Sequence, residues 1–465
     1  MADDARPLDL RSTRRIHVTN VGGAGMSAVA VLLAEMGHQV SGHDPSAESP
    51  FLALLGTVGV EIATGSEPGP LDPATEAVIV STATPADHPQ VATAREREIP
   101  VLHRSAALAA LCADRNAVAI AGTHGKTTTS ALLATILAPQ GPGWVVGAGI
   151  PGLGRSATWG GDGPLVVEAD ESDGTFLALG ANAAIVTNVE PDHLEHWGGE
   201  GELRAAFVRF VTALDGPAVL CADDAGSADL AAAASHPVTY GVAAGSDYRI
   251  ADVAAAGTGV RFVLHHDGQV VPVEVPAAPG HHNARNAAGA LAMAHRLGVP
   301  LADGAAALAV FRGVARRFEV RGEADGVVLV DSYDHLPTEV AAALAAAAAG
   351  PWRRVVCVFQ PHRYSRTASL GRSFADAFAD ADLLAVTDIY PAGEAPRPGV
   401  SGKVVVDAVL DAHPWKPVAW LPSLDDVVRY LSAALRPGDL CLTLGAGDLT
   451  TVPDRVLAAL QAREG

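Results

Sequence analysis

Short apolar runs that are typical of strands alternate along the whole chain with longer Ala- and Leu-rich runs of helical character. This alternation is the pattern of α/β units built on mainly parallel sheets. In the first stretch, from Ile16 to about Leu111, we expect a strand at 16–19 and a helix at 27–36. A second strand should follow the helix and end at Asp44.

Two further stretches repeat the alternation. One opens with a strand at 117–121 and runs to about Arg317, and the other begins near Val327 and ends in a helix at 453–462. A chain of 465 residues is too long for one ordinary core, and typical domain sizes predict about three domains. We place them at residues 1–112, 113–319 and 320–465.

Composition refines this picture of the core and the loops. Hydrophobic residues make up 49% of the chain but aromatic residues only 5%, so Ala, Val and Leu must fill the core. The alanine run at 341–349 is predicted as a helix, because alanine is the best helix former. The glycine-rich segments at 141–143 and 154–163 are predicted as loops.

Charge and cysteine content exclude several classes of protein. A formal charge of −20 argues against a nucleic-acid-binding role, because phosphate backbones are held by clustered Lys and Arg. No apolar run reaches the roughly 18 residues that a membrane span needs, and the N-terminus lacks the apolar region of a signal peptide. We therefore expect a cytoplasmic protein without membrane insertion. The cysteines are far apart and read as reduced core residues: Cys112, Cys221, Cys357 and Cys441.

A candidate phosphate site follows the strand at 117–121, where a glycine loop leads into an apolar helix. Its residues are Gly122, Thr123, His124, Gly125, Lys126, Thr127 and Thr128. Glycines let backbone N–H groups surround phosphate oxygens, Lys126 supplies a cation, and the Thr127 hydroxyl can bind Mg²⁺. The spacing is shorter than that of a strict phosphate-loop motif, and a threonine-rich helix start is the alternative. Only three lysines occur in the chain, which makes Lys126 conspicuous.

Acidic residues follow two other predicted strands. Glu168 opens the sequence Glu-Ala-Asp-Glu-Ser-Asp at the carboxyl end of an apolar strand, where open α/β sheets bind ligands. A solvated acidic turn is the alternative for this cluster alone. A strand at 184–187 leads to His193, which could ligate a second metal ion or cap a turn.

The first stretch carries a second glycine loop between a strand and a helix. It contains Gly22, Gly23, Ala24, Gly25 and Met26. With Asp44 about twenty residues later it is nearly a dinucleotide-binding fingerprint, except that Asn20 replaces the first glycine. Asparagine can adopt the left-handed conformation that a tight turn requires. Alone, the loop would suggest a nicotinamide-dependent dehydrogenase, but no hydride-transfer site is evident elsewhere.

Together these motifs make the chain resemble the Mur ligase family, and the resemblance covers all three stretches. The motifs stand in order at 122–128, 168–173, 188–193, 280–286, 316–318 and 359–367. The resemblance implies three α/β domains: an N-terminal Rossmann-like domain that binds UDP, a central ATPase-like domain with a mainly parallel sheet, and a C-terminal Rossmann-like domain. It also implies an ATP- and Mg²⁺-dependent ligase of peptidoglycan precursor synthesis.

The same resemblance implies a role for particular residues. Lys126, His193, Arg317 and His335 would be catalytic. ATP would contact the loop at 122–128 together with Asn283, Asn286, Arg317 and Asp331, and Mg²⁺ would bind Thr127, Glu168 and His193. The substrates implied are UDP-N-acetylmuramate and L-alanine. They would contact the loop at 22–26 and Asp44, Ser81, Thr82, His335, Arg363 and Arg366.

Two features depart from the family pattern. Ser332 stands where the family retains an aspartate near the nucleotide ribose, and either Asp331 or Asp334 could replace it. Several family members hold the second metal ion with a carbamylated lysine, but the central stretch here has no lysine besides Lys126. The enzyme would then hold that metal ion without a lysine. Ser332 and Asn20 together motivate the competing hypothesis of a non-catalytic nucleotide-sugar binder. The sequence leaves open whether the protein is a monomer or a homodimer.

Overall fold

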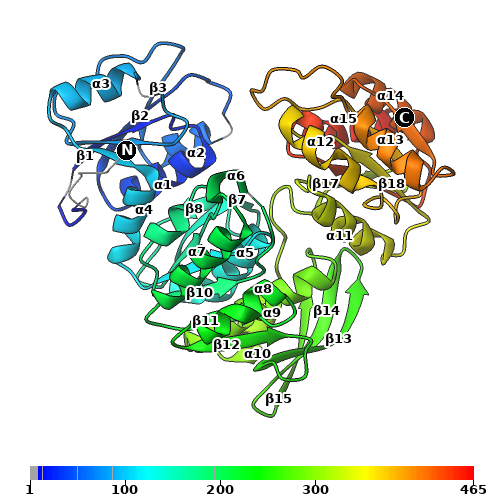
Figure 1. The fold of residues 1–465 in the computed structure, drawn as a ribbon, viewed down its shortest axis with the longest axis horizontal. Coiled ribbons are helices and arrows are strands. Elements are labelled where there is room, and N and C mark those ends of the chain that lie inside the picture. Colours follow the sequence, from blue (N-terminus) through cyan, green and yellow to red (C-terminus); the bar gives the residue numbers. More distant parts are fainter. Residues whose placement is uncertain (1–8, 13, 50, 86, 193, 465) are drawn as a thin grey trace. The chain divides into compact units, whose positions relative to one another are not determined.

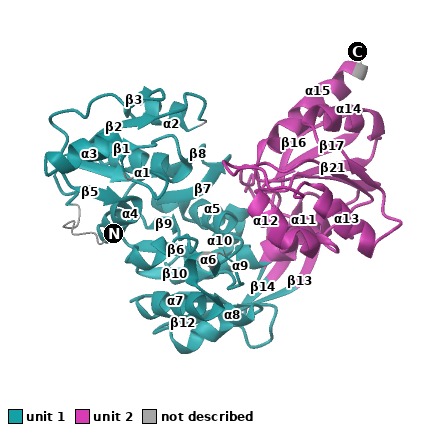
Figure 2. Cartoon of the chain, turned by 45° about the horizontal axis from the view of Figure 1, so that its top comes forward, with its two compact units in different colours: residues 1–251, 264–271, 285–308 teal, residues 252–263, 272–284, 309–465 magenta. Residues whose placement is uncertain are grey.

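The structure is a computed structural model. It describes residues 9–12, 14–49, 51–85, 87–192 and 194–464. Two compact units divide the chain, and Figure 2 colours them teal and magenta. Unit 1 comprises residues 1–251, 264–271 and 285–308, and unit 2 comprises residues 252–263, 272–284 and 309–465. Among the described residues, no helix combines the length and apolar character that crossing a membrane requires.

The first sheet has the strand order β3-β2-β1-β4-β5, and its strands pair in parallel. Figure 1 draws this part of the chain in blue to cyan and labels β1, β2 and β3. The order reverses between β1 and β4, so the loops after these two strands emerge side by side at one edge, where such sheets bind ligands. The elements are β1 Arg15–Thr19, α1 Ala24–Glu35, β2 Gln39–Asp44, α2 Leu52–Thr57, β3 Glu61–Thr64, β4 Ala77–Val80, α3 Pro89–Glu96, β5 Val101–His103 and α4 Arg104–Ala113.

The second sheet has ten strands in the order β15-β14-β13-β12-β11-β10-β6-β9-β7-β8. Its first elements are β6 Ala117–Ala121, α5 Lys126–Leu137, η1 Ala138–Gln140, β7 Gly143–Ile150, β8 Arg155–Thr158, β9 Leu165–Glu168, η2 Thr175–Ala178, β10 Ala183–Val186, α6 Leu194–Trp197 and α7 Glu200–Thr212. The remaining ones are β11 Ala218–Cys221, α8 Ala225–Asp229, η3 Leu230–Ala232, β12 Pro237–Gly241, β13 Tyr248–Ala256, β14 Gly259–His266, β15 Gln269–Val275, α9 His281–Arg296 and α10 Leu301–Leu308.

Strand β6 is an interior strand of this second sheet. All five of its residues are buried, and it pairs in parallel with β10 on one side and with β9 on the other. Parallel strands that are covered on both faces read as continuous apolar runs, which is how β6 appears in the sequence. The segments that follow β6, β9 and β10 therefore leave the sheet at the same edge.

The third sheet has the order β16-β17-β21-β18-β19-β20. Strand β18 shows how it is covered: Val355, Cys357 and Phe359 pack with α11 and α13, whereas Val356 and Val358 pack with α14 and α15. Only β16 pairs antiparallel among its described pairings. The elements are β16 Glu319–Ala324, β17 Val327–Ser332, α11 Pro337–Ala348, β18 Arg354–Phe359, α12 Tyr364–Leu370, η4 Gly371–Phe374, β19 Leu383–Val386, α13 Lys403–Ala412, β20 Val418–Trp420, α14 Leu424–Ala434, β21 Asp439–Leu444, η5 Asp448–Thr451 and α15 Val452–Glu464.

Most elements expected from the sequence are confirmed to within a few residues. The helix predicted at 27–36 begins earlier, at Ala24, because the glycine loop supplies its first turn. One prediction is wrong: the segment 154–163 is not all loop, since Arg155–Thr158 forms the short antiparallel strand β8 against β7. The glycines on either side of this four-residue strand led to the prediction of a loop.

Candidate active site

The phosphate loop of the second sheet is confirmed as a strand–glycine loop–helix unit. Gly122 and Gly125 have φ values of 130° and 82°, which L side chains rarely adopt. A Cβ atom at Gly125 would lie 2.7 Å from the Asn286 Oδ1 atom, and one at Gly122 would lie 2.9 Å from the Asn188 carbonyl oxygen. Both glycines are therefore required by conformation and by space, and helix α5 begins directly after them at Lys126.

Lys126 is held tightly at the base of this loop. Its Nζ atom donates to Glu171 Oε2 at 2.7 Å, to the Gly122 carbonyl at 2.6 Å and to the Thr123 carbonyl at 3.1 Å. Burial opposes the charge of the ammonium group, but Glu171 and then the neighbouring carboxylates outweigh it, so the pKa of Lys126 is raised. The side chain is thus a buried, charged lysine beside the helix N-terminus.

The structure brings the two predicted magnesium ligands together. Thr127 donates its hydroxyl to Glu168 Oε1 at 2.9 Å, and Glu168 Oε2 accepts the Gly147 N–H at 2.7 Å. Oxygen donors of this kind suit Mg²⁺. In the described part of the chain, no three His, Cys, Asp or Glu side chains are grouped as a metal site. His193 lies outside the described residues.

The segment after β10 braces the phosphate loop from the side. Asn188 Oδ1 accepts the His124 N–H at 2.8 Å, and Thr187 donates its hydroxyl to the His124 carbonyl at 2.6 Å. Thr123 exchanges hydrogen bonds with the backbone of Glu190, at 3.2 and 2.9 Å. These hydrogen bonds fix the backbone conformation of the phosphate loop.

The two asparagines at the start of α9 occupy different surroundings. Both are 7% exposed. Asn286 packs against Gly125 of the phosphate loop. Asn283 donates its Nδ2 to the Pro279 carbonyl at 2.7 Å, a local contact that stabilises the helix start.

The glycine loop of the first sheet also forms as predicted. Asn20 adopts the left-handed conformation with φ of 50°. Gly22 donates its N–H to Asp44 Oδ2 at 2.8 Å, which joins the loop after β1 to the end of β2. Gly23 precedes helix α1, and Ala24, Gly25 and Met26 form its first turn, where N–H groups lack helical partners. This helix start is an anion-binding arrangement.

The segment that contains Ser81 and Thr82 follows β4, so it lies at the same sheet edge. Ser81 donates its N–H to Thr84 Oγ1 at 3.1 Å, and Thr82 Oγ1 lies 3.1 Å from His103 Nε2. The Arg104 guanidinium packs against Gly25 and donates to Asp173 Oδ2 at 3.2 Å. Asp173 belongs to the acidic motif, so Arg104 connects the first loop to the segment after β9.

A cluster of imidazoles and arginines occupies the last sheet's carboxyl edge. His335 and His362 have ring centroids 5.5 Å apart, and Arg366 Nη1 lies 3.0 Å from His362 Nδ1. Burial, with help from His335 and Arg366, lowers the pKa of His362 to about 4. The pKa of His335 is also lowered, mainly by burial. Neutral His362 therefore accepts from Arg366 and orients its guanidinium.

Arg363 is exposed at the start of helix α12, with a positive φ of 67° and a ψ of 137°, which residues other than glycine rarely adopt. Its backbone N–H donates to the Tyr390 carbonyl at 2.8 Å, and its carbonyl accepts the Thr367 N–H. Ser365 on the same turn donates to Glu394. The strained backbone thus sets Arg363 and Arg366 on one end of a short helix, as a fork for a carboxylate would require.

Ser332, where the resemblance predicts an aspartate, is buried, and its hydroxyl both donates and accepts a hydrogen bond. Its hydroxyl donates to Asp334 Oδ2 at 2.5 Å and accepts the Phe318 N–H at 3.0 Å. Asp334 Oδ1 lies 3.9 Å from Arg317 Nη1. Asp334 thus supplies a carboxylate two residues beyond the expected place.

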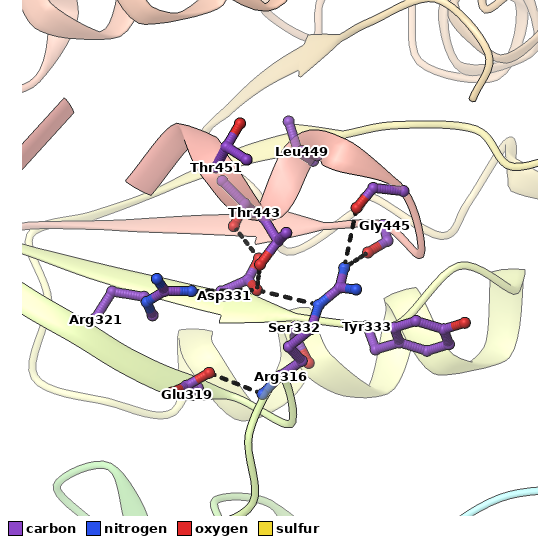
Figure 3. Close-up of polar contacts among 12 residues, drawn as sticks. Arg316, Glu319, Arg321, Asp331, Ser332, Tyr333, Thr443, Gly445, Leu449 and Thr451 are labelled. Atoms are coloured by element: carbon purple, nitrogen blue, oxygen red, sulfur yellow. Dashed lines mark hydrogen bonds and ion pairs between the residues drawn. The ribbon is translucent and has the colours of Figure 1, made fainter. Parts of the chain in front are cut away.

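Asp331 is buried, with 1% of its surface exposed. Figure 3 shows its carboxylate between Arg316 and Arg321. Thr443 and Thr450 donate their hydroxyls to it at 2.8 and 2.6 Å. These contacts occupy both carboxylate oxygens inside the domain.

Comparisons with known proteins place this geometry in a family. Three family models match the chain in order: "Mur ligase family, catalytic domain" over residues 15–116, "Mur ligase middle domain" over 120–294, and "Mur ligase, glutamate ligase domain" over 316–447. The chain belongs to the Mur ligase family. The resemblance inferred from the sequence motifs is confirmed, and so is the three-domain α/β architecture.

Relatives among the Mur ligases match almost the whole chain. A protein of a Geobacter species is 42% identical over 96% of this chain and 98% of its own length, and one of Kineococcus radiotolerans is 46% identical over 97% of both. Both are named UDP-N-acetylmuramate–L-alanine ligase. The crystal structure of UDP-N-acetylmuramate-alanine ligase from Thermotoga maritima matches with a TM-score of 0.82 at 27% identity, covering 97% of this chain and all of that one.

The sequence analysis did not single out several residues that contact the predicted site residues of this Mur ligase. Glu171, which pairs with Lys126, stands inside the acidic motif and could have been singled out by its position. Asn188, Arg316 and His362 also lie in the quoted motifs. Their contacts depend on strands and loops distant in sequence, so no local pattern distinguishes them from their neighbours. The match at 15–116 also argues against the dehydrogenase alternative.

Proposed function

We propose that the chain is an ATP-dependent ligase that joins L-alanine to the lactoyl carboxylate of UDP-N-acetylmuramate, a step of peptidoglycan precursor synthesis. The supporting observation is the contact between Thr127 and Glu168 beside the buried ammonium of Lys126, in a chain 42% identical over nearly its full length to a ligase of that name. Lys126 and the helix N-terminus would receive the ATP phosphates. Mg²⁺, held by Thr127 and Glu168, would neutralise phosphate charge.

We assign the three domains at residues 1–112, 113–319 and 320–465 to the three ligands. The loop at 22–26 would bind the UDP pyrophosphate through the N-terminus of α1, with Asp44, Ser81 and Thr82 beside the nucleotide sugar. The phosphate loop would bind ATP. Arg363 and Arg366 would bind the carboxylate of L-alanine, with His335 beside it.

The chemistry proceeds in two balanced steps. A carboxylate oxygen of the sugar substrate attacks the γ-phosphorus of ATP, the bond to ADP breaks, and an acyl phosphate forms. The neutral amine of alanine then attacks the acyl carbon and expels phosphate, so an amide, ADP and phosphate result, and one proton is released from the amine. The first step brings two anions together, and Lys126 and Arg317 would supply the positive field that it needs.

An assay of ADP release tests this proposal. Release should require both UDP-N-acetylmuramate and an amino acid, and L-alanine should be favoured in a panel that includes glycine and serine. UDP-sugar binding by calorimetry without ADP release at any Mg²⁺ concentration would instead identify a non-catalytic binder.

A further inference from the structure

Arg316, the residue before the proposed ATP contact Arg317, is engaged within its own domain. Its Nη2 atom donates to the Gly445 carbonyl at 2.8 Å and lies 3.3 Å from the Gly447 carbonyl oxygen. Its Nε atom lies 3.5 Å from Asp331 Oδ2. Figure 3 shows the guanidinium spanning from Asp331 to the loop at 445–447. All of these groups follow or belong to β17 and β21.

The side chain of Arg317 is held less tightly within the domain than that of Arg316. Within the described part of the chain, its guanidinium faces the Tyr333 ring, at 5.4 Å from the centroid, and forms an ion pair with Asp334 at 3.9 Å. The Arg316 guanidinium lies 4.8 Å from the same ring, and the Tyr333 N–H donates to the Arg316 carbonyl at 2.8 Å. Among the described residues the Arg317 guanidinium thus has no hydrogen-bond partner, so its donors can bind a ligand, and Tyr333 contacts both arginines.

The backbone around Arg317 is itself constrained. Arg316 and Phe318 on either side of it have φ values of 58° and 52°, in the left-handed region that residues other than glycine rarely adopt. Such a conformation persists only where surrounding contacts impose it. The bonds of Arg316 to the loop at 445–447 are contacts of this kind.

The loop at 445–447 also packs next to the cluster of His335, His362 and Arg366. Gly447 is packed so closely that a Cβ atom there would lie 2.5 Å from Gln360 Oε1 and would also clash with the Tyr390 ring. Tyr390 stacks on His362, with an interplanar angle of 11°, and His362 orients Arg366. One loop therefore contacts Arg316 on one side and the Tyr390–His362 pair on the other.

We propose that Arg316 is a positioning residue, which holds Arg317 for ATP and, through the loop at 445–447, supports the pocket for the amino acid. The proposal rests on the proposed function, because Arg317 and Arg366 are assigned there. It predicts that loss of the Arg316 side chain weakens the use of two substrates and leaves the third unaffected.

Steady-state kinetics of Arg316→Asn test this prediction. Asparagine tolerates the left-handed conformation, so the backbone is preserved while the guanidinium is removed. We expect the KM values for ATP and L-alanine to rise about tenfold, equivalent to about 1.4 kcal/mol each, with the KM for UDP-N-acetylmuramate changed less than about twofold. Arg321→Asn is the matched control, because Arg321 faces the same Asp331 at 3.9 Å, and its other ion pair among the described residues is with Asp454 and not with the loop.

A purely structural role for Arg316 would lower the melting temperature of Arg316→Asn and leave all three of its KM values unchanged, and that result would overturn the proposal. Hydrogen–deuterium exchange provides a test that does not need turnover. Arg316→Asn should increase exchange in peptides covering 314–319 and 444–449, and Arg321→Asn should not. Equal exchange in both variants would overturn the proposal even if the wild type proved inactive, whereas wild-type inactivity alone would count only against the proposed function.

Discussion

The buried pair of Lys126 and Glu171 allows catalysis to be separated from stability. Lys126→Met removes the cation and leaves a carboxylate that is only 2% exposed, 2.7 Å from where the ammonium had been. Removing one partner of a buried pair costs about 3–5 kcal/mol. Burial already raises the pKa of Glu171, so the carboxyl can take up a proton, and we expect a cost near the lower end of this range.

Glu171→Gln should cost less, about 1–3 kcal/mol. The ammonium of Lys126 keeps two carbonyl acceptors, those of Gly122 and Thr123, and the new amide oxygen can still accept from it. The double variant Lys126→Met with Glu171→Gln buries no unpaired charge. We therefore expect it to be about 2 kcal/mol more stable than Lys126→Met, because the two effects are coupled.

Activity should follow a different order. Lys126→Met and the double variant should both lose at least about 10²-fold in kcat, the scale for one preorganised charge at a phosphoryl transfer site. Glu171→Gln should keep most of its activity. Calorimetric melting and ADP release would be measured on all three variants. A double variant no more stable than Lys126→Met would refute the assignment of the pair, and a Lys126→Met enzyme within tenfold of wild type would refute the role of Lys126.

Two close contacts and one lowered pKa each lead to a further prediction. Gly125→Ala should abolish ADP release while leaving UDP-sugar affinity unchanged by calorimetry, because φ is 82° and the new Cβ would lie 2.7 Å from Asn286 Oδ1. Ser332→Asp should lower the melting temperature without raising kcat, since it sets a second carboxylate next to Asp334, now 2.5 Å from the serine hydroxyl; a gain in kcat would contradict this. Because burial above all lowers the folded-state pKa of His362 to about 4 from 6.5, the unfolded chain takes up that proton first as pH falls. The free energy of unfolding by urea should therefore drop more in wild type than in His362→Asn between pH 6.5 and 4, and parallel curves would contradict the assignment.

Local patterns in the sequence predict much of this fold. The strand at 117–121, its glycine loop and helix α5 are adjacent in sequence, so residue spacing alone reveals them. The left-handed conformation of Asn20 could also be predicted from the local sequence, because the chain must turn tightly within a few residues there. The short strand β8 escaped notice because four residues between glycines give too little periodicity.

Contacts between distant segments could not be predicted. Arg316 and Arg317 are adjacent in the sequence, yet only the fold shows that the first faces Gly445 while the second keeps its donors available. The sequence does not distinguish Asn283 from Asn286. In the fold, Asn283 donates to the Pro279 carbonyl and Asn286 packs on the phosphate loop. Such differences follow from side-chain direction and tertiary packing.

Isotope transfer tests the central proposal most directly. UDP-N-acetylmuramate labelled with ¹⁸O in the lactoyl carboxylate would be incubated with the enzyme, ATP, Mg²⁺ and L-alanine, and the released phosphate would be analysed by mass spectrometry. An acyl phosphate intermediate requires one labelled oxygen to pass from the carboxylate to phosphate in each turnover. We predict that the amount of labelled phosphate equals the amount of ADP formed. Release of unlabelled phosphate would contradict the proposed mechanism.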